Sequence, residues 1–254
     1  MNKPRILIWD VEVSTVQILI ENYGLKNYIK YFNPKDIKRD WILLSVAWKW
    51  HGEPNTYCVS VKHDNVQDDR GVVETFYHAL KNADIIIGHN IKAFDVKKFN
   101  SKLLEYGYDP LLFNSNQVID TLQLCRKYFK LSSNRLGYVA QKLGVDAKDE
   151  SPDWAKVLDG DEQEIRYMRK YNKQDVIVNE QVYNKLRGWH ESHPNLNLYN
   201  PVRDVVGQTV LACTNCQSTN LVKDGYSYTR VSKRARARCK DCGNCFTHGK
   251  RIRT

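Results

Sequence analysis

The sequence predicts an α/β domain built around a mixed β-sheet, followed by a small C-terminal module that needs a metal ion to fold. Three observations lead to this prediction. Apolar strand patterns dominate the first part of the chain, strand and helix patterns alternate after residue 84, and five of the seven cysteines lie at or beyond residue 213. With 254 residues, of which 42% are hydrophobic, the chain can form one full core and a second small module.

Three apolar runs near the start predict a β-meander. The first run, RILIW at residues 5–9, has the character of a buried central strand. Residues 41–50 and 55–61 are rich in aromatic and β-branched side chains, which favour strands. Because the first three predicted elements are all strands, they are expected to form a meander, and this part of the sheet is expected to be antiparallel.

The rest of the domain alternates between helix and strand. Such alternation favours parallel strands joined by helices, so the whole sheet is expected to be mixed. A segment rich in Pro, Asn and His at residues 188–204 then interrupts the periodicity and is interpreted as a linker. We therefore expect a domain over residues 1–190, a linker over 191–207 and a C-terminal module over 208–254. The further predicted elements are helices at 71–81, from 94 onward, 121–129, 136–143 and 161–186, and strands at 84–88 and 118–119.

The positive charge of the chain, formally +10, is concentrated in its C-terminal module. From Gly207 onward, ten lysines and arginines face only two aspartates, Asp224 and Asp241. A compact basic module predicts a polyanionic partner, and nucleic acid fits best. No apolar stretch reaches the roughly 18 to 20 residues that span a bilayer, and the N-terminus lacks the order of a signal peptide, so we expect a cytoplasmic protein without a membrane partner.

Acidic side chains follow the predicted strands at positions where a two-metal hydrolase needs them. Asp10 and Glu12 come directly after the first strand, and the period-2 alternation of an extended chain points both to the same side. Asp95 begins a helix after a later strand, while Tyr171 and Asp175 lie four residues apart on one helix face. Taken singly, these residues are also compatible with an acidic turn, a helix cap and a surface pair. As a set, they predict carboxylates gathered around divalent cations.

The order and context of these residues resemble the three exonuclease motifs of the DEDD superfamily. The chain has D-x-E at residues 10–12, N-x-x-x-F-D at residues 90–95 and Y-x-x-x-D at residues 171–175. The tyrosine of the third motif is similar to the DEDDy branch. The resemblance covers roughly residues 4–188, and it implies a ribonuclease H-like fold that hydrolyses nucleic acid from a 3′ end.

The resemblance also assigns a role to each residue. It implies two Mg²⁺ or Mn²⁺ ions, one held by Asp10, Glu12 and Asp175. Asp10 bridges to the second ion, which Asp95 supports directly or through water. Tyr171 orients or deprotonates the attacking water, and an ordinary phenol pKa of about 10 favours orientation.

Two residues of the second motif have alternative interpretations. Asn90 and Phe94 either contact the substrate strand or its last base, or serve the fold, Asn90 as a cap and Phe94 within the core. The motifs do not separate DNA from RNA, because that distinction depends on contacts near the 2′ position. DNA is our expectation for the substrate.

Two C-x-x-C pairs in the C-terminal module predict a structural zinc site. Cys213 and Cys216 form one pair, and Cys239 and Cys242 form the other. Four thiolates in two such pairs suit one tetrahedral Zn²⁺, whose binding would supply most of the folding free energy of so small a unit. The stretch resembles the zinc ribbons of transposases and transcription-related proteins. Cys245 departs from that pattern, either as a free thiol or as a ligand in place of Cys242.

The sequence between the two pairs, YSYTRVSKRARAR, predicts a hairpin that binds nucleic acid. Its alternation is expected to interleave tyrosines and arginines on one face and to turn the alanines away. Guanidinium groups bind phosphates and tyrosine rings stack on bases. A solvated charged face with tyrosines over a small core is the alternative. The predicted contact residues are Tyr226, Tyr228, Arg230, Arg234, Arg236 and Arg238.

The sequence thus predicts a two-metal-ion 3′ to 5′ exonuclease that acts on single-stranded or 3′-ended DNA and binds nucleic acid through a zinc ribbon. One alternative is a structure-specific endonuclease or a ribonuclease that uses the same carboxylates. Another is a binding or assembly protein, whose ribbon docks a replication or repair protein and whose nuclease domain depends on that partner.

Overall fold

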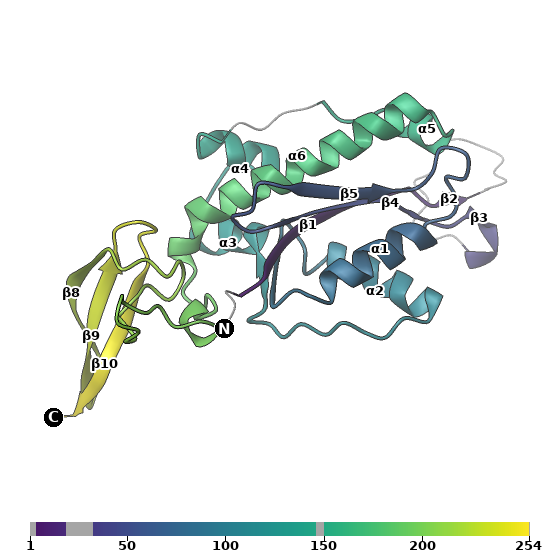
Figure 1. Cartoon of the computed structure of the whole chain (residues 1–254). Helices are drawn as coiled ribbons and strands as arrows, with labels where there is room; N and C mark the ends of the chain where they lie inside the picture. The colour runs from purple at the N-terminus through teal and green to yellow at the C-terminus, as the bar shows by residue number, and fades with distance from the viewer. Residues whose placement is uncertain (1–3, 19–32, 146–149, 254) are drawn as a thin grey trace.

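A five-stranded mixed sheet forms the centre of the N-terminal part of the chain (Figure 1). The computed structural model describes residues 4–18, 33–145 and 150–253. In the order β5-β4-β1-β6-β7, the first three strands are antiparallel and the last two run parallel to β1, so the predicted meander and mixed sheet are confirmed. The strands are β1 (Ile6–Val13), β4 (Leu43–Trp50), β5 (Thr56–Ser60), β6 (Ile85–Gly88) and β7 (Val118–Asp120).

The first strand is longer than the apolar pattern predicts. Beyond Trp9 it continues through Asp10 and Glu12 to Val13, still paired with β4, and a register shift between Glu12 and Val13 interrupts the regular ladder. The apolar pattern ends at the first charged residue, whereas the backbone ladder does not. The two acids therefore lie within the sheet and not after it.

Helices cover both faces of this sheet. The long helix α6 crosses one face against β1, β4 and β5, with α3 and α4 beside it, while α1 and α2 lie on the other face (Figure 1). The predicted helices are confirmed. The short α5 is an addition, because five residues are too few to show a helical period. The helices are α1 (Arg70–Leu80), α2 (Asp95–Tyr106), α3 (Thr121–Tyr128), α4 (Leu136–Lys142), α5 (Trp154–Leu158) and α6 (Glu162–Leu186).

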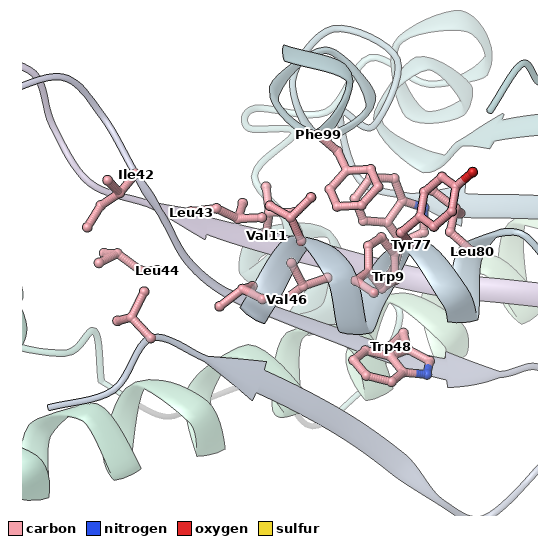
Figure 2. Close-up of a cluster of buried hydrophobic side chains, with 14 of the residues drawn as sticks. Trp9, Val11, Ile42, Leu43, Leu44, Val46, Trp48, Tyr77, Leu80 and Phe99 are labelled. Carbon is pink, nitrogen blue, oxygen red and sulfur yellow. The ribbon is translucent and has the colours of Figure 1, made fainter. Parts of the chain in front are cut away.

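Alternate residues of β1 contribute to two separate cores. Odd-numbered residues of β1 point toward α1 and α2. Among them, Trp9 packs on Phe76 and Phe99 at ring-centroid distances of 4.8 and 6.0 Å (Figure 2). Even-numbered Ile6 and Ile8 belong to the core under α6. The same alternation directs the two acids at positions 10 and 12 toward α6.

Short elements complete this part of the fold. β2 (Gln17–Ile18) pairs antiparallel with β3 (Ile37–Arg39). The 3-10 helices are η1 (Pro34–Asp36), η2 (Arg187–Trp189) and η3 (Leu196–Leu198). Among the described residues, no helix combines the length and the apolar character that crossing a membrane requires.

A second, three-stranded antiparallel sheet forms the C-terminal module and projects away from the first sheet (Figure 1). Its strands are β8 (Leu221–Tyr228), β9 (Ser232–Cys239) and β10 (Cys245–Arg253), in the order β10-β9-β8. β8 and β9 form the predicted hairpin, closed by a 2.8 Å hydrogen bond from the Thr229 amide to the Ser232 carbonyl. β10 adds an edge strand that the sequence analysis does not identify.

The two parts of the chain are joined by direct packing. Leu196 is buried in the core under α6, and its amide donates to the Thr214 carbonyl at 2.8 Å. The side-chain amide of Asn215 donates to the Arg187 carbonyl, just after α6, at 2.9 Å. Residues interpreted as a linker thus take part in the contact between the sheet domain and the cysteine pairs.

Candidate active site

Three carboxylates converge between β1 and α6. Oxygens of Asp10, Glu12 and Asp175 lie within 4.8 Å of one another. β1 supplies the first two from its α6-facing side, and α6 supplies the third. Three carboxylate oxygens this close together could hold a divalent metal ion.

A side-chain amide of α6 holds Asp10 in place. Asn172 is fully buried, and its Nδ2 donates to Oδ2 of Asp10 at 2.8 Å. Its Oδ1 accepts a 3.0 Å hydrogen bond from the hydroxyl of Ser45, which is the cross-strand partner of Glu12. Neither Asn172 nor Ser45 is predicted from the sequence. The only signal was the position of Asn172 inside the third motif.

Asp95 lies in the first turn of α2, beside this group. It is buried, and its Oδ1 accepts a hydrogen bond from the Val11 amide at 3.2 Å. It is not one of the three carboxylates that meet within 4.8 Å, but its charge contributes to raising the pKa of Asp10. Asp95 therefore acts on the carboxylate cluster through its charge, from a somewhat longer distance.

The site accumulates negative charge that burial makes unfavourable. Burial, and after it the neighbouring carboxylates, raise the pKa of Asp10 well above its ordinary range. Burial and the charge of Asp175 raise the pKa of Glu12 to about 8. Burial raises the pKa of Asp95 to about 7. Because like charges in a low-dielectric site disfavour ionisation, a bound cation is needed to keep all of these groups charged at neutral pH.

Tyr171 lies one helical turn before Asp175 and is partly buried. Burial, and after it the charges of Asp175 and Glu12, raise the pKa of Tyr171 above its ordinary value. The phenol therefore stays protonated at neutral pH, where it can donate a hydrogen bond but cannot act as a base. Of the two roles that the resemblance implies, this environment favours orientation of water.

Two hollows adjoin the carboxylates. A groove of about 560 Å³ lies between α4 and α6, with Tyr171 and Asp175 in its wall. A largely apolar pocket of about 350 Å³ is lined by Glu12 and by the rings of Phe94 and Trp154. Phe94 is 37% exposed and is therefore not a core residue. Trp154 escapes sequence analysis because it belongs to the unpredicted α5.

Partly buried hydrogen bonds hold the loop that carries Asn90 and Phe94. Asn90 has a φ of 72°, in the left-handed region that Asn tolerates better than most residues, and its carbonyl accepts from the amides of Ala93 and Phe94. Asp120, buried at the end of β7, accepts from the amides of Asn90 and Lys92 at 3.0 and 3.2 Å. The backbone of Asn90 thus shapes the turn that presents Phe94 to the pocket.

Four cysteine sulfur atoms meet at the base of the C-terminal sheet, all within 4.8 Å of one another. Two pairs of them are 3.6 Å apart, too far for a disulfide of about 2.05 Å. Zn–S bonds of about 2.3 Å in a tetrahedron place sulfur atoms about 3.8 Å apart, so the four thiolates fit one Zn²⁺. Cys245 lies outside the group, and its thiol donates to Asp224 at 2.8 Å. The four residues are Cys213, Cys216, Cys239 and Cys242.

The tyrosines and arginines of the C-terminal module lie on opposite faces of its sheet, so their predicted interleaving on one face is wrong. Tyr226 pairs directly with Ala235 and Tyr228 with Lys233, and directly paired residues share a face. Arg230 lies in the turn between β8 and β9 and belongs to neither strand. The arginines that point to the opposite face are Arg234, Arg236 and Arg238.

The length of the turn explains this outcome. Only Arg230 and Val231 separate the closing residues Thr229 and Ser232, and a two-residue turn pairs even-numbered residues with odd-numbered ones. The alternation of residues within each strand does not reveal which residues of β8 and β9 face the same side.

The fold and the carboxylate cluster define an RNase H-like nuclease. A family model described as the RNase H superfamily matches residues 33–187, which is more than half of the chain. The chain therefore belongs to the RNase H superfamily. This superfamily acts with divalent metal ions, in agreement with the acidic cluster.

Two further comparisons involve DNA polymerases. A stretch of 67 residues is 40% identical to DNA polymerase III PolC-type from Ureaplasma parvum serovar 3 (strain ATCC 700970), covering 26% of this chain and 4% of that protein. The structure of the family B DNA polymerase from the hyperthermophilic archaeon Pyrobaculum calidifontis aligns with a TM-score of 0.55 and 19% identity, covering 73% of this chain and 25% of that one. At this identity the structural likeness shows the fold alone. The chain spans a small part of the length of either relative.

Proposed function

We propose that the chain is a metal-dependent 3′ to 5′ exonuclease of the DEDDy type that shortens DNA strands from their 3′ ends. The observation that carries the proposal is the convergence of Asp10, Glu12 and Asp175 next to the protonated Tyr171, where a groove and an apolar pocket both reach the carboxylates. The polymerase names of the two relatives favour DNA over RNA.

The donor set fits Mg²⁺ or Mn²⁺, which prefer oxygen ligands. Two such ions, when bound, activate the attacking water and stabilise the leaving oxygen of the phosphodiester. Asp10, Glu12 and Asp175 would hold them, with Asp95 supporting the site. The raised pKa of Glu12 supports this assignment, since the negative charges of Asp175 and Asp95 contribute to it and a bound cation would neutralise them.

The other residues of the site act on the water and on the substrate. The Tyr171 hydroxyl donates a hydrogen bond that orients the attacking water, and Asn172 keeps Asp10 in the position that the cluster requires. Phe94 and Trp154 offer aromatic faces for the 3′-terminal base, and such stacking stabilises a bound base by about 1–3 kcal/mol. The preceding nucleotides would follow the groove lined by Arg135.

The apolar pocket favours an exonuclease over an endonuclease. A terminal base can turn into the pocket of Phe94 and Trp154 at little cost, because it has a stacking neighbour on one side only. An internal base would have to separate from neighbours on both sides, which costs a few kcal/mol.

The C-terminal module would serve this activity as a zinc ribbon that binds nucleic acid. The four clustered thiolates support one structural Zn²⁺, and the surplus of basic residues supports attraction to a polyanion. Raising the local concentration of strand ends near the carboxylates would be its contribution. A replication or repair protein is a further candidate partner of the ribbon.

The test uses three 5′-labelled linear substrates, which are single-stranded DNA, RNA of the same sequence and duplex DNA, together with an internally labelled circular single strand, each with Mg²⁺ or Mn²⁺. We expect linear DNA to shorten from its 3′ end and the circle to stay intact, with Asp10→Asn inactive on all substrates. A cut circle indicates an endonuclease, and faster loss of RNA indicates a ribonuclease. Binding without cleavage indicates a protein whose nuclease site depends on a partner.

A further inference from the structure

The ribbon sheet has two faces of different chemistry. The tyrosine face carries Tyr226, Tyr228 and Lys233, and the arginine face carries the β9 arginines. We propose that the tyrosine face binds single-stranded nucleic acid and that the arginine face does not carry this binding. The inference rests on the proposed nuclease function and adds to it the type of strand and the surface that holds it.

The two tyrosines are arranged for contact with a ligand and not for packing. Tyr226 is 44% exposed and Tyr228 is 72% exposed, with ring centroids 6.3 Å apart. The ammonium group of Lys233 lies 5.1 Å from the Tyr226 ring centroid, so a positive charge accompanies the rings. Aromatic rings beside a cation suit a strand with unpaired bases, which stack on the rings while their phosphates approach the cation. A duplex keeps its bases stacked internally and cannot use the rings.

The arginines of the opposite face are already engaged within the ribbon. Asp224 accepts from Arg236 at 2.6 Å and from Arg238 at 3.2 Å. The Nε of Arg234 donates to the Gly249 carbonyl at 3.1 Å. A phosphate on this face would compete with these bonds and would meet the charge of Asp224.

The tyrosine face has no such counter-charge. Between residues 208 and 253, all of which the structure describes, the acidic residues are Asp224 and Asp241. Asp224 belongs to the arginine face, and Asp241 accepts hydrogen bonds from Ser218 and Asn220 beside the cysteine pairs. The charge of Lys233 is therefore available to a polyanion.

The position of the ribbon sets a minimum length for the strand that it binds. The cysteine pairs pack at the end of α6, and the helix from Asp175 to Leu186 is roughly 17 Å long at 1.5 Å per residue. At about 3.4 Å per stacked nucleotide, a strand needs on the order of five nucleotides to leave the carboxylates and reach the ribbon. The tyrosines should therefore matter for long strands and not for very short ones.

The experiment measures fluorescence anisotropy with full-length, zinc-loaded protein that carries Asp10→Asn to prevent cleavage. The probes are labelled oligothymidylates of about 20 and about 4 nucleotides and a duplex of about 20 base pairs. Tyr226→Leu with Tyr228→Leu removes both rings, and the matched Tyr226→Phe with Tyr228→Phe retains them. Arg236→Gln with Arg238→Gln tests the opposite face.

We expect the leucine pair to weaken binding of the long single strand by about tenfold or more and to leave the short strand and the duplex within about twofold. The phenylalanine pair should bind like the parent protein. The arginine pair should weaken single-strand binding less than the leucine pair does. Lys233→Gln should reduce the slope of log affinity against log salt by about 0.7.

The inference is overturned if the leucine and phenylalanine pairs bind the long strand equally, if the arginine pair loses more affinity than the leucine pair, or if duplex binding falls in parallel. Zinc content, measured for each variant, shows that the ribbon is still folded. The nuclease proposal is tested separately with the unmutated site. Ring-dependent binding by a protein that never cuts DNA would support the inference and refute the proposed function, and cleavage without ring-dependent binding would do the reverse.

Discussion

The side chain of Asn172 on α6 links this helix to strand β1, because its Nδ2 donates a 2.8 Å hydrogen bond to Asp10. Its Oδ1 is occupied by the hydroxyl of Ser45, so the amide cannot rotate without losing both bonds. Such a contact fixes the direction of the Asp10 carboxylate, which we propose binds a metal ion, without touching the metal itself.

Asn172→Ala is therefore expected to weaken Mn²⁺ binding by roughly 10- to 100-fold. The loss should appear as a higher Mn²⁺ concentration for half-maximal activity and as a weaker binding isotherm in calorimetry. Asn179→Ala is the matched control, because Asn179 is also buried on α6 but its Oδ1 accepts a hydrogen bond from Thr121, whereas Asn172 donates one to a carboxylate of the site. If both variants bind Mn²⁺ like the parent, Asn172 serves only the stability of the fold.

Without Mg²⁺ or Mn²⁺, the stability of the protein is expected to fall as the pH rises toward 8. The folded-state pKa values of Glu12, about 8, and Asp95, about 7, lie above their ordinary values. A carboxyl with a raised folded pKa holds its proton more tightly in the folded chain than in the unfolded chain, so its contribution is fully present below the unfolded pKa of about 4 and is lost as the pH rises through the folded pKa.

Thermal unfolding at pH 6.5 and pH 8.5, without a chelator so that zinc stays bound, measures this effect. Burial lowers the pKa of His193 to about 4, so its contribution to stability is lost only as the pH falls from about 6.5. Starting at pH 6.5 therefore avoids the titration of this histidine. Mn²⁺ should raise the unfolding temperature more at pH 8.5 than at pH 6.5, because it binds the ionised carboxylates. Glu12→Gln should unfold at a higher temperature than the parent in metal-free buffer at pH 8.5. A lower unfolding temperature for this variant would contradict the expected effect of the buried charge.

The pocket beside Glu12 predicts a defect in substrate binding when its rings are removed. Phe94→Ala and Trp154→Ala should each raise KM for single-stranded DNA by about tenfold, because each removes a surface for the terminal base. Tyr57→Ala provides a control, since Tyr57 is similarly exposed but stacks on Trp48 away from the carboxylates. Steady-state kinetics with a labelled 3′-terminal nucleotide give KM and kcat separately. An unchanged KM in both pocket variants would remove the pocket from the proposed substrate path.

The proposed zinc site predicts different effects for substitution of two neighbouring cysteines, Cys242 and Cys245. Cys242→Ser should lose the ion and unfold the ribbon, because its sulfur belongs to the group of four. Cys245→Ser should keep one zinc per chain, because its thiol contacts Asp224 instead. Metal analysis of the purified variants decides between them. Loss of zinc in Cys245→Ser would reopen the possibility that this residue is the ligand.

The parts of the fold that could be predicted from the sequence depend on local periodicity. Alternation within β1 places the acids at positions 10 and 12 on one side, and a spacing of four places Tyr171 and Asp175 on one face of α6. The cysteine pairs are similarly local. These patterns survive folding because each is a property of one strand, one helix or one turn.

The parts that could not be predicted depend on partners distant in sequence or on exact registers. Asn172 is hydrogen-bonded to Ser45, 127 residues away, and to Asp10, and its position inside the third motif does not reveal either partner. Trp154 belongs to a helix too short to show a period. The separation of tyrosines from arginines follows from a two-residue turn, which sets how β8 and β9 pair.

The packing of the ribbon against α6 leads to a last prediction, for Gly188. A Cβ at this position would lie 2.0 Å from the carbonyl oxygen of Cys242 and 3.3 Å from the amide nitrogen of Asn244. Both are backbone atoms, so no side-chain rotation relieves the clash. Gly188→Ala is therefore expected to lower the unfolding temperature and to expose residues 191–207 to proteolysis, although loss of chain entropy in the unfolded state would by itself stabilise the variant by about 0.4–1 kcal/mol.

Gly71→Ala is the matched control, since a Cβ there in the first turn of α1 meets no atom within 4 Å and should leave the unfolding temperature unchanged or raise it. Differential scanning calorimetry of both variants, with zinc content measured alongside, isolates the contact. If Gly188→Ala unfolds at the same temperature as Gly71→Ala and retains its zinc, then the ribbon does not rest on the end of α6 in solution. A lower temperature for Gly188→Ala alone would mean that the cysteine pairs and the catalytic helix form one structural unit, so that zinc binding also supports the helix that carries Tyr171 and Asp175.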